Sequence, residues 1–407
     1  MLAVWSDSPL MTDRKLRIGV AGLGRAFSLM VPTFAHHPRL AIVAGADPRP
    51  EARAQFARDF SAKAYATVED LCADPTLDAV YVATPHQFHL AHARMAAANG
   101  KHMLVEKPMA LTLADCRAMI DAARAAGVHL VVGHSHSFDA PIARAREIIA
   151  SGAVGALRMI TAVNFTDFLY RPRRPEELAT AQGGGVLFNQ APHQVDVVRF
   201  LGGGRVRSVR ASAGAWDAGR PTQGAYCAFL TFADGAFASL TYSGYAHFDS
   251  DELCNWIGES GLPKDPKRYG VARRKLAQAA ASEAELKRAQ NYGGADHAPP
   301  TVSAEADPRY HQHFGFVIAS CDRADLRPLP QGVMIYDDEA PRLEPLPPPD
   351  VPRGEVIAEL YDAVVNDRPA VHSGQWGLAT MEVCLAMLQS AREQKEILLA
   401  HQTDLVP

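Results

Sequence analysis

The segment from Gly22 to Phe27, which reads Gly-Leu-Gly-Arg-Ala-Phe, lies between a short apolar run and a helical pattern. Gly22 permits a tight turn, and Gly24 lets the backbone approach a phosphate closely. The helix that follows offers unpaired N–H groups and the positive end of its dipole to an anion. This position favours a dinucleotide-binding turn over a plain tight turn, and Phe27, in place of the third glycine, predicts looser helix packing. The candidate contacts are Gly22, Gly24, Arg25, Ala26 and Phe27.

Asp47 follows the second apolar run, Leu40–Ala46, near the spacing expected for the acidic residue that binds an adenosine ribose. A carboxylate at this place accepts hydrogen bonds from the 2′-hydroxyl and repels a 2′-phosphate, which favours NAD. Arg49 lies two residues further on, and a guanidinium can bind that phosphate, so NADP stays open as the alternative cofactor. The simpler interpretation is that Asp47-Pro48 only starts a turn.

Lys107 stands in the sequence Glu106-Lys107-Pro108, directly after the apolar run Lys101–Glu106. Open α/β sheets bind their ligands at the carboxyl ends of the strands, where this lysine is expected. Its amine is a candidate for exchanging a proton with a substrate hydroxyl. The alternative is a surface lysine before a proline that ends the strand.

A second polar cluster follows the three glycines at 183–185. From Asn189 onward the sequence indicates a helix despite Pro192, so Asn189 and His193 are expected on one helical face. His193 could take the proton of a hydroxyl while a hydride leaves the same carbon. Asp196 is three residues beyond and could orient that imidazole ring. A histidine that merely fills the core is the alternative.

The segment Tyr170-Arg171-Pro172-Arg173-Arg174 precedes those glycines. Planar guanidinium groups bind carboxylates through two parallel hydrogen bonds, so this segment predicts a small-molecule substrate that is anionic. The alternative is a solvated loop. The candidate substrate contacts are therefore Tyr170, Arg171, Arg173, Arg174, Asn189 and His193.

Predicted strands and helices alternate in the first third of the chain, and they must position these candidate residues. Predicted strands are Leu16–Ala21, Leu40–Ala46, Leu77–Ala83, Lys101–Glu106 and Val128–Gly133. Predicted helices are Arg25–His36, Glu51–Phe60, Gln87–Asn99 and Thr112–Ala126, the last capped by Thr112. This rhythm predicts βαβ units, and hence an N-terminal Rossmann domain with a doubly wound parallel sheet over residues 14–135.

After residue 135 the rhythm changes. A helix at Pro141–Ala150 is followed by longer alternating strands, and Ala233-Asp234-Gly235 indicates a hairpin. We expect a C-terminal α+β domain over residues 136–407 with an open, mostly antiparallel sheet. The fold class is thus α/β overall. Within this domain we expect a helical insertion at about 264–292, either as a solvated surface helix or as a segment over the active site or a subunit contact. A proline-rich connector at Arg342–Arg353 precedes a last helix at about Gly377–Gln394.

Composition narrows the function classes. The formal net charge is −4, which argues against a nucleic-acid partner. The six cysteines are scattered and form no metal-binding pattern, so no metal site is predicted. No apolar run is long enough for a membrane span, and residues 1–13 resemble a flexible extension more than a signal peptide, so a cytoplasmic protein is expected. Either Met1 or Met11 is the natural start.

These sites in this order resemble the glucose-fructose oxidoreductase and inositol dehydrogenase family, called Gfo/Idh/MocA. The resemblance covers about Arg17 to Gly244 and rests also on Ala83-Thr84-Pro85, Gly100-Lys101-His102 and Ser151-Gly152-Ala153-Val154-Gly155. It implies an NAD(P)-dependent oxidoreductase, a homo-oligomer (dimer or tetramer), and further cofactor contacts at Thr84, Pro85, His86, His89, Glu106 and Lys107. It also implies Lys107 and His193 as the catalytic pair. Asn189 stands where the family usually has Asp, which leaves it to orient the substrate rather than act as a base.

Within the family, Phe188–Asp196 and the stretch Ser320–Arg327 resemble the branch of phthalate 4,5-cis-dihydrodiol dehydrogenases. This implies oxidation of a dicarboxylated cis-dihydrodiol to 4,5-dihydroxyphthalate in aromatic catabolism, which fits the arginines at 171–174. Two alternatives are a sugar or inositol dehydrogenase of the same family and a non-catalytic protein that senses NAD.

Overall fold

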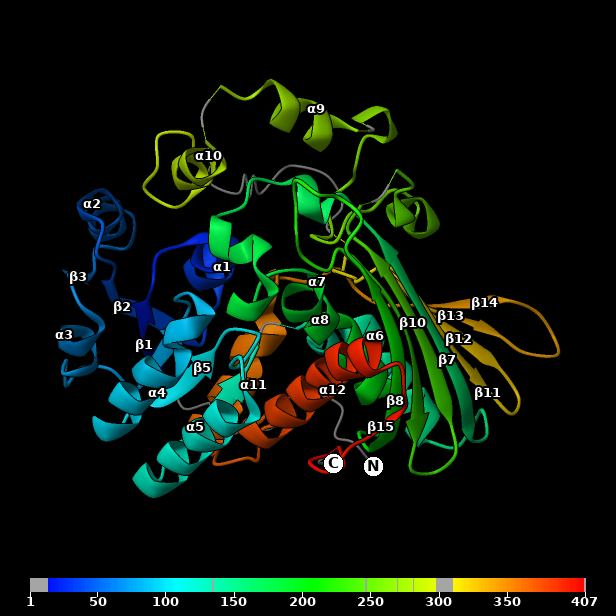
Figure 1. Cartoon of the computed structure of the whole chain (residues 1–407). Helices are drawn as coiled ribbons and strands as arrows, with labels where there is room; N and C mark the ends of the chain where they lie inside the picture. Colours follow the sequence, from blue (N-terminus) through cyan, green and yellow to red (C-terminus); the bar gives the residue numbers. More distant parts are fainter. Residues whose placement is uncertain are drawn as a thin grey trace.

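Two sheets form the frame of the molecule. The computed structural model describes residues 14–133, 135–245, 247–268, 270–280, 282–297 and 310–405. The expected extension at 1–13, with its two candidate start residues, lies outside the described residues. Figure 1 shows the first sheet with its helices on one side of the molecule and the second, larger sheet on the other, with α12 running between them. The α/β class with an N-terminal parallel sheet and a mostly antiparallel second sheet is confirmed.

The first sheet has six parallel strands in the order β3-β2-β1-β4-β5-β6. Its strands are β1 Leu16–Ala21, β2 Leu40–Ala46, β3 Lys63–Tyr65, β4 Ala79–Val82, β5 His102–Val105 and β6 Leu130–Val132. Its helices are α1 Arg25–His36, α2 Pro50–Phe60, α3 Val68–Cys72, α4 His89–Ala98 and α5 Leu113–Ala126. The strand order reverses between β1 and β4, and a crevice at such a switch point is where doubly wound sheets bind ligands.

The second sheet has nine strands in the order β14-β13-β12-β11-β7-β10-β9-β8-β15, antiparallel except for the β10–β7 pair. The strands are β7 Leu157–Phe165, β8 Val206–Gly214, β9 Ala225–Phe232, β10 Phe237–Ser243, β11 Phe316–Cys321, β12 Asp325–Leu329, β13 Gly332–Tyr336, β14 Arg342–Pro345 and β15 Ile397–Leu398. The predicted hairpin joins β9 and β10, with Gly235 at φ 94° in its turn. The predicted connector at Arg342–Arg353 was partly wrong, because its first four residues pair with β13 as an edge strand.

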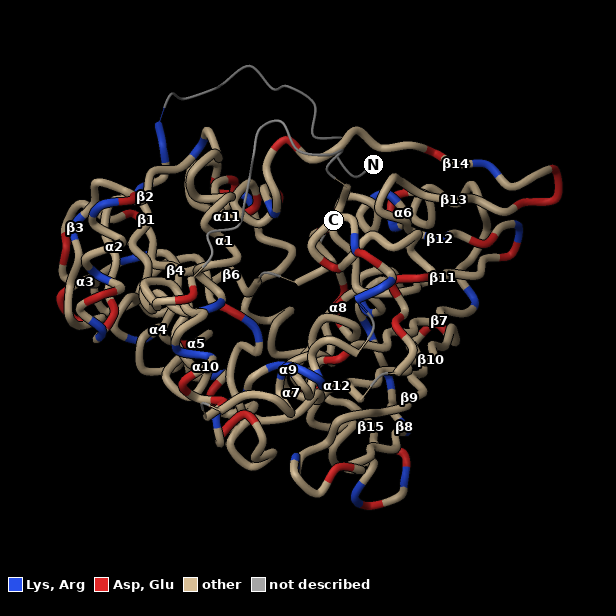
Figure 2. Tube along the Cα trace, turned by 90° about the horizontal axis from the view of Figure 1, so that it is seen from above, with Lys and Arg blue, Asp and Glu red and all other residues tan. Residues whose placement is uncertain are grey.

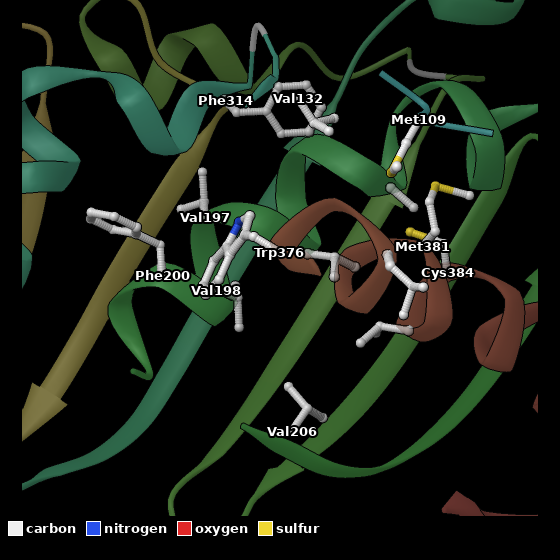
Figure 3. Packing of buried hydrophobic residues seen from close by; sticks show 14 of the residues in the cluster. Met109, Val132, Val197, Val198, Phe200, Val206, Phe314, Trp376, Met381 and Cys384 are labelled. Atoms are coloured by element: carbon white, nitrogen blue, oxygen red, sulfur yellow. The ribbon is translucent and has the colours of Figure 1, made fainter. Parts of the chain in front are cut away.

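Helices cover one face of this second sheet. They are α6 Ala140–Ala150, the short α7 Val186–Asn189, α8 Ala191–Leu201 and α12 Gly374–Glu393. Every residue of α8 is buried. Figure 3 shows Val197 and Val198 of α8 beside Trp376 of α12, with Met109 and Val132 of the first domain in the same cluster. The hydrophobic core is therefore continuous between the two domains.

The chain returns to the first domain near its end. Helix α11, Gly354–Asn366, buries Val356, Ile357 and Leu360 in the same cluster as the strand residues of β1. The hydroxyl of Thr33 on α1 donates to the carbonyl of Pro352 at 2.5 Å. The expected boundary, with everything after residue 135 in the second domain, therefore differs from the packing, since an amphipathic helix finds its apolar partner wherever the fold offers one.

The predicted insertion is helical. It contains α9 Val271–Gln278 and α10 Glu283–Gln290, and Ser282 with Glu285 forms a capping box at the start of α10. In the upper part of Figure 1, α9 lies over the second domain and α10 over the first. Over the part of the chain that the structure describes, no helix combines the length and apolar character needed to cross a membrane.

Candidate active site

The turn after β1 has the geometry of an anion-binding site. Gly22 has φ 94°, and a Cβ there would lie 2.9 Å from the carbonyl oxygen of Ala83 after β4, so only glycine fits. Gly24 is the N-cap of α1, no side chain caps the helix, and its first turn carries no acidic residue. The first N–H groups of α1 therefore face the crevice without a side-chain partner from the cap, as a bound pyrophosphate requires.

Phe27 does not loosen the packing of α1, as the sequence predicted it would. Its side chain is fully buried, and its ring centroid lies 5.8 Å from that of Phe56 and 4.9 Å from that of Tyr292. The missing third glycine thus does not loosen the helix packing as expected, because an aromatic cluster fills the space. Only the backbone of Phe27 remains for a dinucleotide, whereas Arg25 is exposed and Ala26 is half-buried.

Asp47 is buried at the end of β2, where a ribose-binding carboxylate is expected, and accepts the N–H of Leu23 at 2.9 Å. Arg49 covers the same carboxylate, since its Nε donates to Oδ1 at 2.9 Å. Its other guanidinium nitrogens donate to the carbonyls of Leu23 at 2.7 Å and Tyr292 at 3.1 Å. The negative charge of Asp47 is therefore balanced, and the insertion, through Tyr292, holds the balancing arginine in place.

His89 joins the loops after β4 and β5. It is almost completely buried, with Nε2 2.9 Å from the Thr84 carbonyl and Nδ1 3.1 Å from the Pro108 carbonyl. Its ring thus positions the predicted contacts Thr84 and Pro85 instead of presenting a free nitrogen to a ligand. His86 lies against the Gly183 turn of the second domain, and burial lowers its pKa to about 4, so its ring is neutral at pH 7.

Lys107 reaches across the domain boundary. Its Nζ donates to the backbone carbonyl of Asn189 at 3.1 Å. Burial lowers the pKa of this ammonium group, which brings the neutral amine within reach at lower pH than for an exposed lysine. The preceding Glu106 is buried and accepts the hydroxyl of Tyr81, and burial raises the pKa of its carboxyl group. The Glu106 side chain is therefore held against strand β4 of the parallel sheet.

The sequence predicted Asn189 and His193 on one continuous helix, and this prediction was wrong. Helix α7 ends at Asn189 and α8 starts at Ala191, because Pro192 has no N–H to continue the backbone hydrogen bonds across Gln190, whose φ is −118° and ψ −41°. The carboxamide of Asn189 donates to the carbonyls of Gly185 at 2.8 Å and Gly183 at 3.2 Å. An aspartate carboxylate would face both of these oxygens, which accounts physically for the amide in this position.

His193 lies in the first turn of α8, with its ring centroid 5.0 Å from those of His136 and Phe314. Asp196 does not orient it, because the oxygens of Asp196 accept Trp376 Nε1 at 2.6 Å and Thr380 Oγ1 at 2.8 Å. The ring beside His193 instead belongs to His136, whose Nδ1 lies 2.7 Å from Asp139 Oδ2.

Sequence reasoning missed His136 and Asp139. They follow β6 at the carboxyl edge of the parallel sheet, and this position was the available signal. Two further charged groups, Glu259 and Arg353, act on the pKa of Lys107, the first raising it and the second lowering it. Glu259 accepts Asn164 Nδ2 at 3.3 Å, and Arg353 donates to Gln312 at 3.0 Å. Neither belongs to a sequence motif, so only the fold reveals them.

The predicted substrate arginines already have protein partners. Arg171 pairs with Asp167 at 2.9 Å and is half exposed. Arg173 lies over the Phe168 ring at 3.6 Å, and burial lowers its pKa to about 10. Arg174 pairs with Glu176 at 3.0 Å, and the Tyr170 hydroxyl donates to Asp217 at 3.0 Å. Arg171 is thus the most open of the three toward a ligand.

Comparison with known proteins now adds to this geometry. The profile of the oxidoreductase family with an NAD-binding Rossmann fold matches residues 16–134, and that of the GFO/IDH/MocA C-terminal domain matches residues 142–262. The chain is 47% identical over 384 residues to a 1-carboxy-3-chloro-3,4-dihydroxycyclohexa-1,5-diene dehydrogenase of Comamonas testosteroni, covering 93% of this chain and 96% of that enzyme. The chain belongs to the Gfo/Idh/MocA family.

Other relatives support the same assignment. A putative dehydrogenase of Bordetella bronchiseptica RB50 has a solved structure with a TM-score of 0.89 and 42% identity, covering 95% of this chain and 100% of that one. A trans-1,2-dihydrobenzene-1,2-diol dehydrogenase of Mus musculus is 34% identical over 134 residues, which is 33% of this chain and 40% of that enzyme. The protein is an NAD-dependent oxidoreductase, and the turn at Gly22, the open start of α1 and Asp47 fit that cofactor. Among the described residues no cluster suited to a metal ion occurs.

Replacing Arg49 tests how the cofactor is selected. In Arg49→Ala the carboxylate of Asp47 loses its covering charge and repels a 2′-phosphate more strongly. We expect the ratio of kcat/KM for NAD to that for NADP to rise about tenfold. The matched control is Arg53→Ala, because the Arg53 side chain, among the described residues, donates only to the carbonyls of Asp47 and Pro48. Equal ratios in the two variants would contradict this role for Arg49.

Replacing Asn189 by aspartate tests the carboxamide. The new carboxylate would face the carbonyls of Gly183 and Gly185, so Asn189→Asp should lower the free energy of unfolding by about 1–3 kcal/mol and reduce turnover. Urea denaturation and NADH formation measure the two effects. Asn99→Asp is the control, since Asn99 also donates to a carbonyl, that of Met95, but in water, and should change stability by about 0.5 kcal/mol or less. A similar small change for both variants would remove the argument for the amide.

Proposed function

We propose that this enzyme oxidises a ring cis-diol that carries carboxylate, and that a phthalate cis-dihydrodiol giving 4,5-dihydroxyphthalate is the first substrate to test. The observation that carries the reaction type is the contact between Lys107 Nζ and the carbonyl of Asn189. It brings an amine from the Rossmann sheet to the short segment that leads into His193. We infer that the amine of Lys107 and the imidazole of His193, both able to move protons, act on the same substrate.

Two observations support a negatively charged substrate. The guanidinium group of Arg353 lies close enough to Lys107 to lower the pKa of its ammonium group, so two cations are neighbours beside the candidate catalytic residues. Such a concentration of cations favours an anion with which guanidinium groups form paired hydrogen bonds. In addition, the relative that matches over nearly its whole length is named for a substrate that is itself a carboxylated cyclohexadiene diol.

The residues divide the work as follows. NAD, when bound, supplies the hydride acceptor for the carbinol carbon. His193 takes the proton of the hydroxyl. Lys107 assists by donating a hydrogen bond from Nζ to the same oxygen. Asn189 keeps the turn at 183–185 in place, which sets the carbonyl that Lys107 contacts. The resulting ring ketone tautomerises to a catechol, so the aromatic product makes the reaction hard to reverse.

A substrate panel tests the proposal. Purified protein is mixed with NAD or NADP and with phthalate cis-dihydrodiol, an uncarboxylated benzene cis-dihydrodiol, inositol or glucose. We expect formation of reduced nicotinamide with the dicarboxylated diol and a much lower kcat/KM for the uncarboxylated one. Preference for inositol or glucose would replace the substrate assignment by the polyol alternative. Absence of reduction with every compound would contradict the proposal.

Two single variants test the catalytic pair. Lys107→Met and His193→Ala should each lower kcat by about 10²–10⁴ while NAD still binds, because each removes a group that handles the hydroxyl proton. Stopped-flow absorbance of NADH and calorimetry with NAD separate chemistry from binding. Lys63→Met serves as a control, since that lysine is exposed and pairs with Asp74 on the far edge of the sheet. Unchanged turnover in either catalytic variant would exclude that residue from the mechanism.

We also propose that the outer face of the second sheet forms a homo-oligomer contact. Phe229 of β9 and Phe237 of β10 are 47% and 38% exposed, and their rings stack with centroids 5.4 Å apart. Exposed aromatic pairs on a sheet face are typical of a contact with another chain. The double variant Phe229→Ser and Phe237→Ser should therefore reduce the mass measured by light scattering to that of a smaller assembly. An unchanged mass would place the contact elsewhere or show that the chain is monomeric.

A further inference from the structure

A cavity of 510 Å³ lies between the helical insertion and the segment that carries Arg171. One wall is formed by residues 170–172, and the other by Lys264, Arg268 and the inner sides of α9 and α10. We call it the insertion pocket. Lys107, Asn189 and His193 are not part of its wall, whereas Tyr170 and Arg171, which the sequence predicted as substrate contacts, are. Its volume lies in the range of small-molecule sites, about 300–1,000 Å³.

The insertion pocket has a surplus of positive charge. Four cationic side chains line it, namely Arg171, Lys264, Arg268 and Lys275, against the single carboxylate of Asp167. Asp167 is already paired with Arg171, and Lys264 with Asp251 at 2.8 Å. Within the described ranges, Arg268 and Lys275 form neither an ion pair nor a side-chain hydrogen bond. Figure 2 shows the basic residues of α9 as a continuous blue stretch. Two cations are thus free to bind an anion.

The same pocket has an apolar side. Val271 and Leu276 of α9 and Leu286 of α10 line it together with the ring of Tyr170. Arg273 lies 3.7 Å over that ring, on the insertion, and fixes its orientation. A free inorganic anion would leave these apolar groups without a partner. A ligand with a ring and a carboxylate uses both halves of the wall.

The insertion itself is held firmly enough to form such a wall. Tyr292, at its end, is buried in the first domain and donates to Asp59 at 2.6 Å. On the other domain, Glu283 accepts Arg220 at 2.7 Å and the backbone N–H of Arg173 at 2.9 Å. The expectation of a solvated surface helix is therefore incomplete, because the insertion is anchored on both domains.

We propose that the insertion pocket binds a small ring-bearing carboxylate at a second site, outside the catalytic centre. The ligand class follows from the pocket's own charge and apolar wall. That it is the same class of molecule as the substrate and product rests on the proposed function. A bound carboxylate would contact Arg268 and Lys275 and lay its ring against Leu276 and Tyr170.

Calorimetry with phthalate as the probe tests this on the full-length protein without NAD. Wild type should bind two phthalate molecules per chain, one at the catalytic centre and one in the insertion pocket. The double variant Arg268→Ala and Lys275→Ala should weaken one of these sites at least about tenfold and leave the other unchanged, since two charge-assisted contacts are lost. Both residues are exposed, so folding should persist, and circular dichroism checks it.

A matched control is the double variant Arg274→Ala and Arg288→Ala. These arginines are exposed on α9 and α10 and lie outside the pocket wall, and their replacement removes the same charge as the test variant does. It should retain both phthalate sites. Equal weakening in control and test variants would reduce the effect to general charge and overturn the proposal, as would two intact sites in the test variant. Binding of benzamide or inorganic phosphate as tight as that of phthalate would overturn the ligand class.

Failure of the proposed function is distinguishable from failure of this proposal. If no diol in the panel is oxidised but the test variant loses one phthalate site, the pocket stands and the substrate assignment fails. If the dicarboxylated diol is oxidised and phthalate binds only one site, lost in Lys107→Met and intact in the test variant, the reaction stands and the pocket proposal fails.

Discussion

The buried carboxylate of Asp196 is the interaction on which the arrangement of the active site depends. It accepts hydrogen bonds from Trp376 and Thr380 of α12 and from Ser137 in the segment after β6. A buried carboxylate is costly unless its oxygens are paired, so α8 can take only the position in which all these donors meet it. His193 lies one helical turn earlier, and its place beside His136 and Phe314 follows from that constraint.

The two domains are joined at several places that converge on the cofactor crevice. Lys107 contacts the carbonyl of Asn189, α11 returns to the apolar cluster of the first domain, and Tyr292 of the insertion is buried beside Phe27. Because Arg49 donates to the carbonyl of Tyr292 while covering Asp47, the insertion also influences the end of the crevice where the ribose is expected. The insertion therefore links the expected ribose end of the cofactor site to the second domain.

Asn189 illustrates how local geometry decides the use of a residue type. Its amide donates to two carbonyl oxygens of the glycine turn, a task that a carboxylate does not perform. In the proposed mechanism, proton transfer is left to His193, which has His136 and Asp139 beside it, and to Lys107, whose pKa burial lowers. The arginines at 171–174, in contrast, are largely engaged with neighbouring carboxylates, so fewer of them are open to a ligand than their spacing suggests.

The sequence by itself determined the elements whose signals are local: five of the six parallel strands, the turn at Gly22, the cap at Thr112, the hairpin at Gly235 and the helical insertion. It gave no sign of the sixth strand, Lys63–Tyr65, which has no continuous apolar run. It also singled out Lys107, Asn189 and His193, because residue type and position after a strand or a glycine turn are visible along the chain. Only the tertiary structure decided what surrounds them. The Phe27 side chain packs in an aromatic cluster, and Asp196 accepts a hydrogen bond from α12 instead of orienting His193. Arg353 and Glu259, from distant segments, lie close enough to Lys107 to act on its pKa. Such contacts depend on how buried polar groups find partners across the fold, and no spacing within the chain encodes that choice.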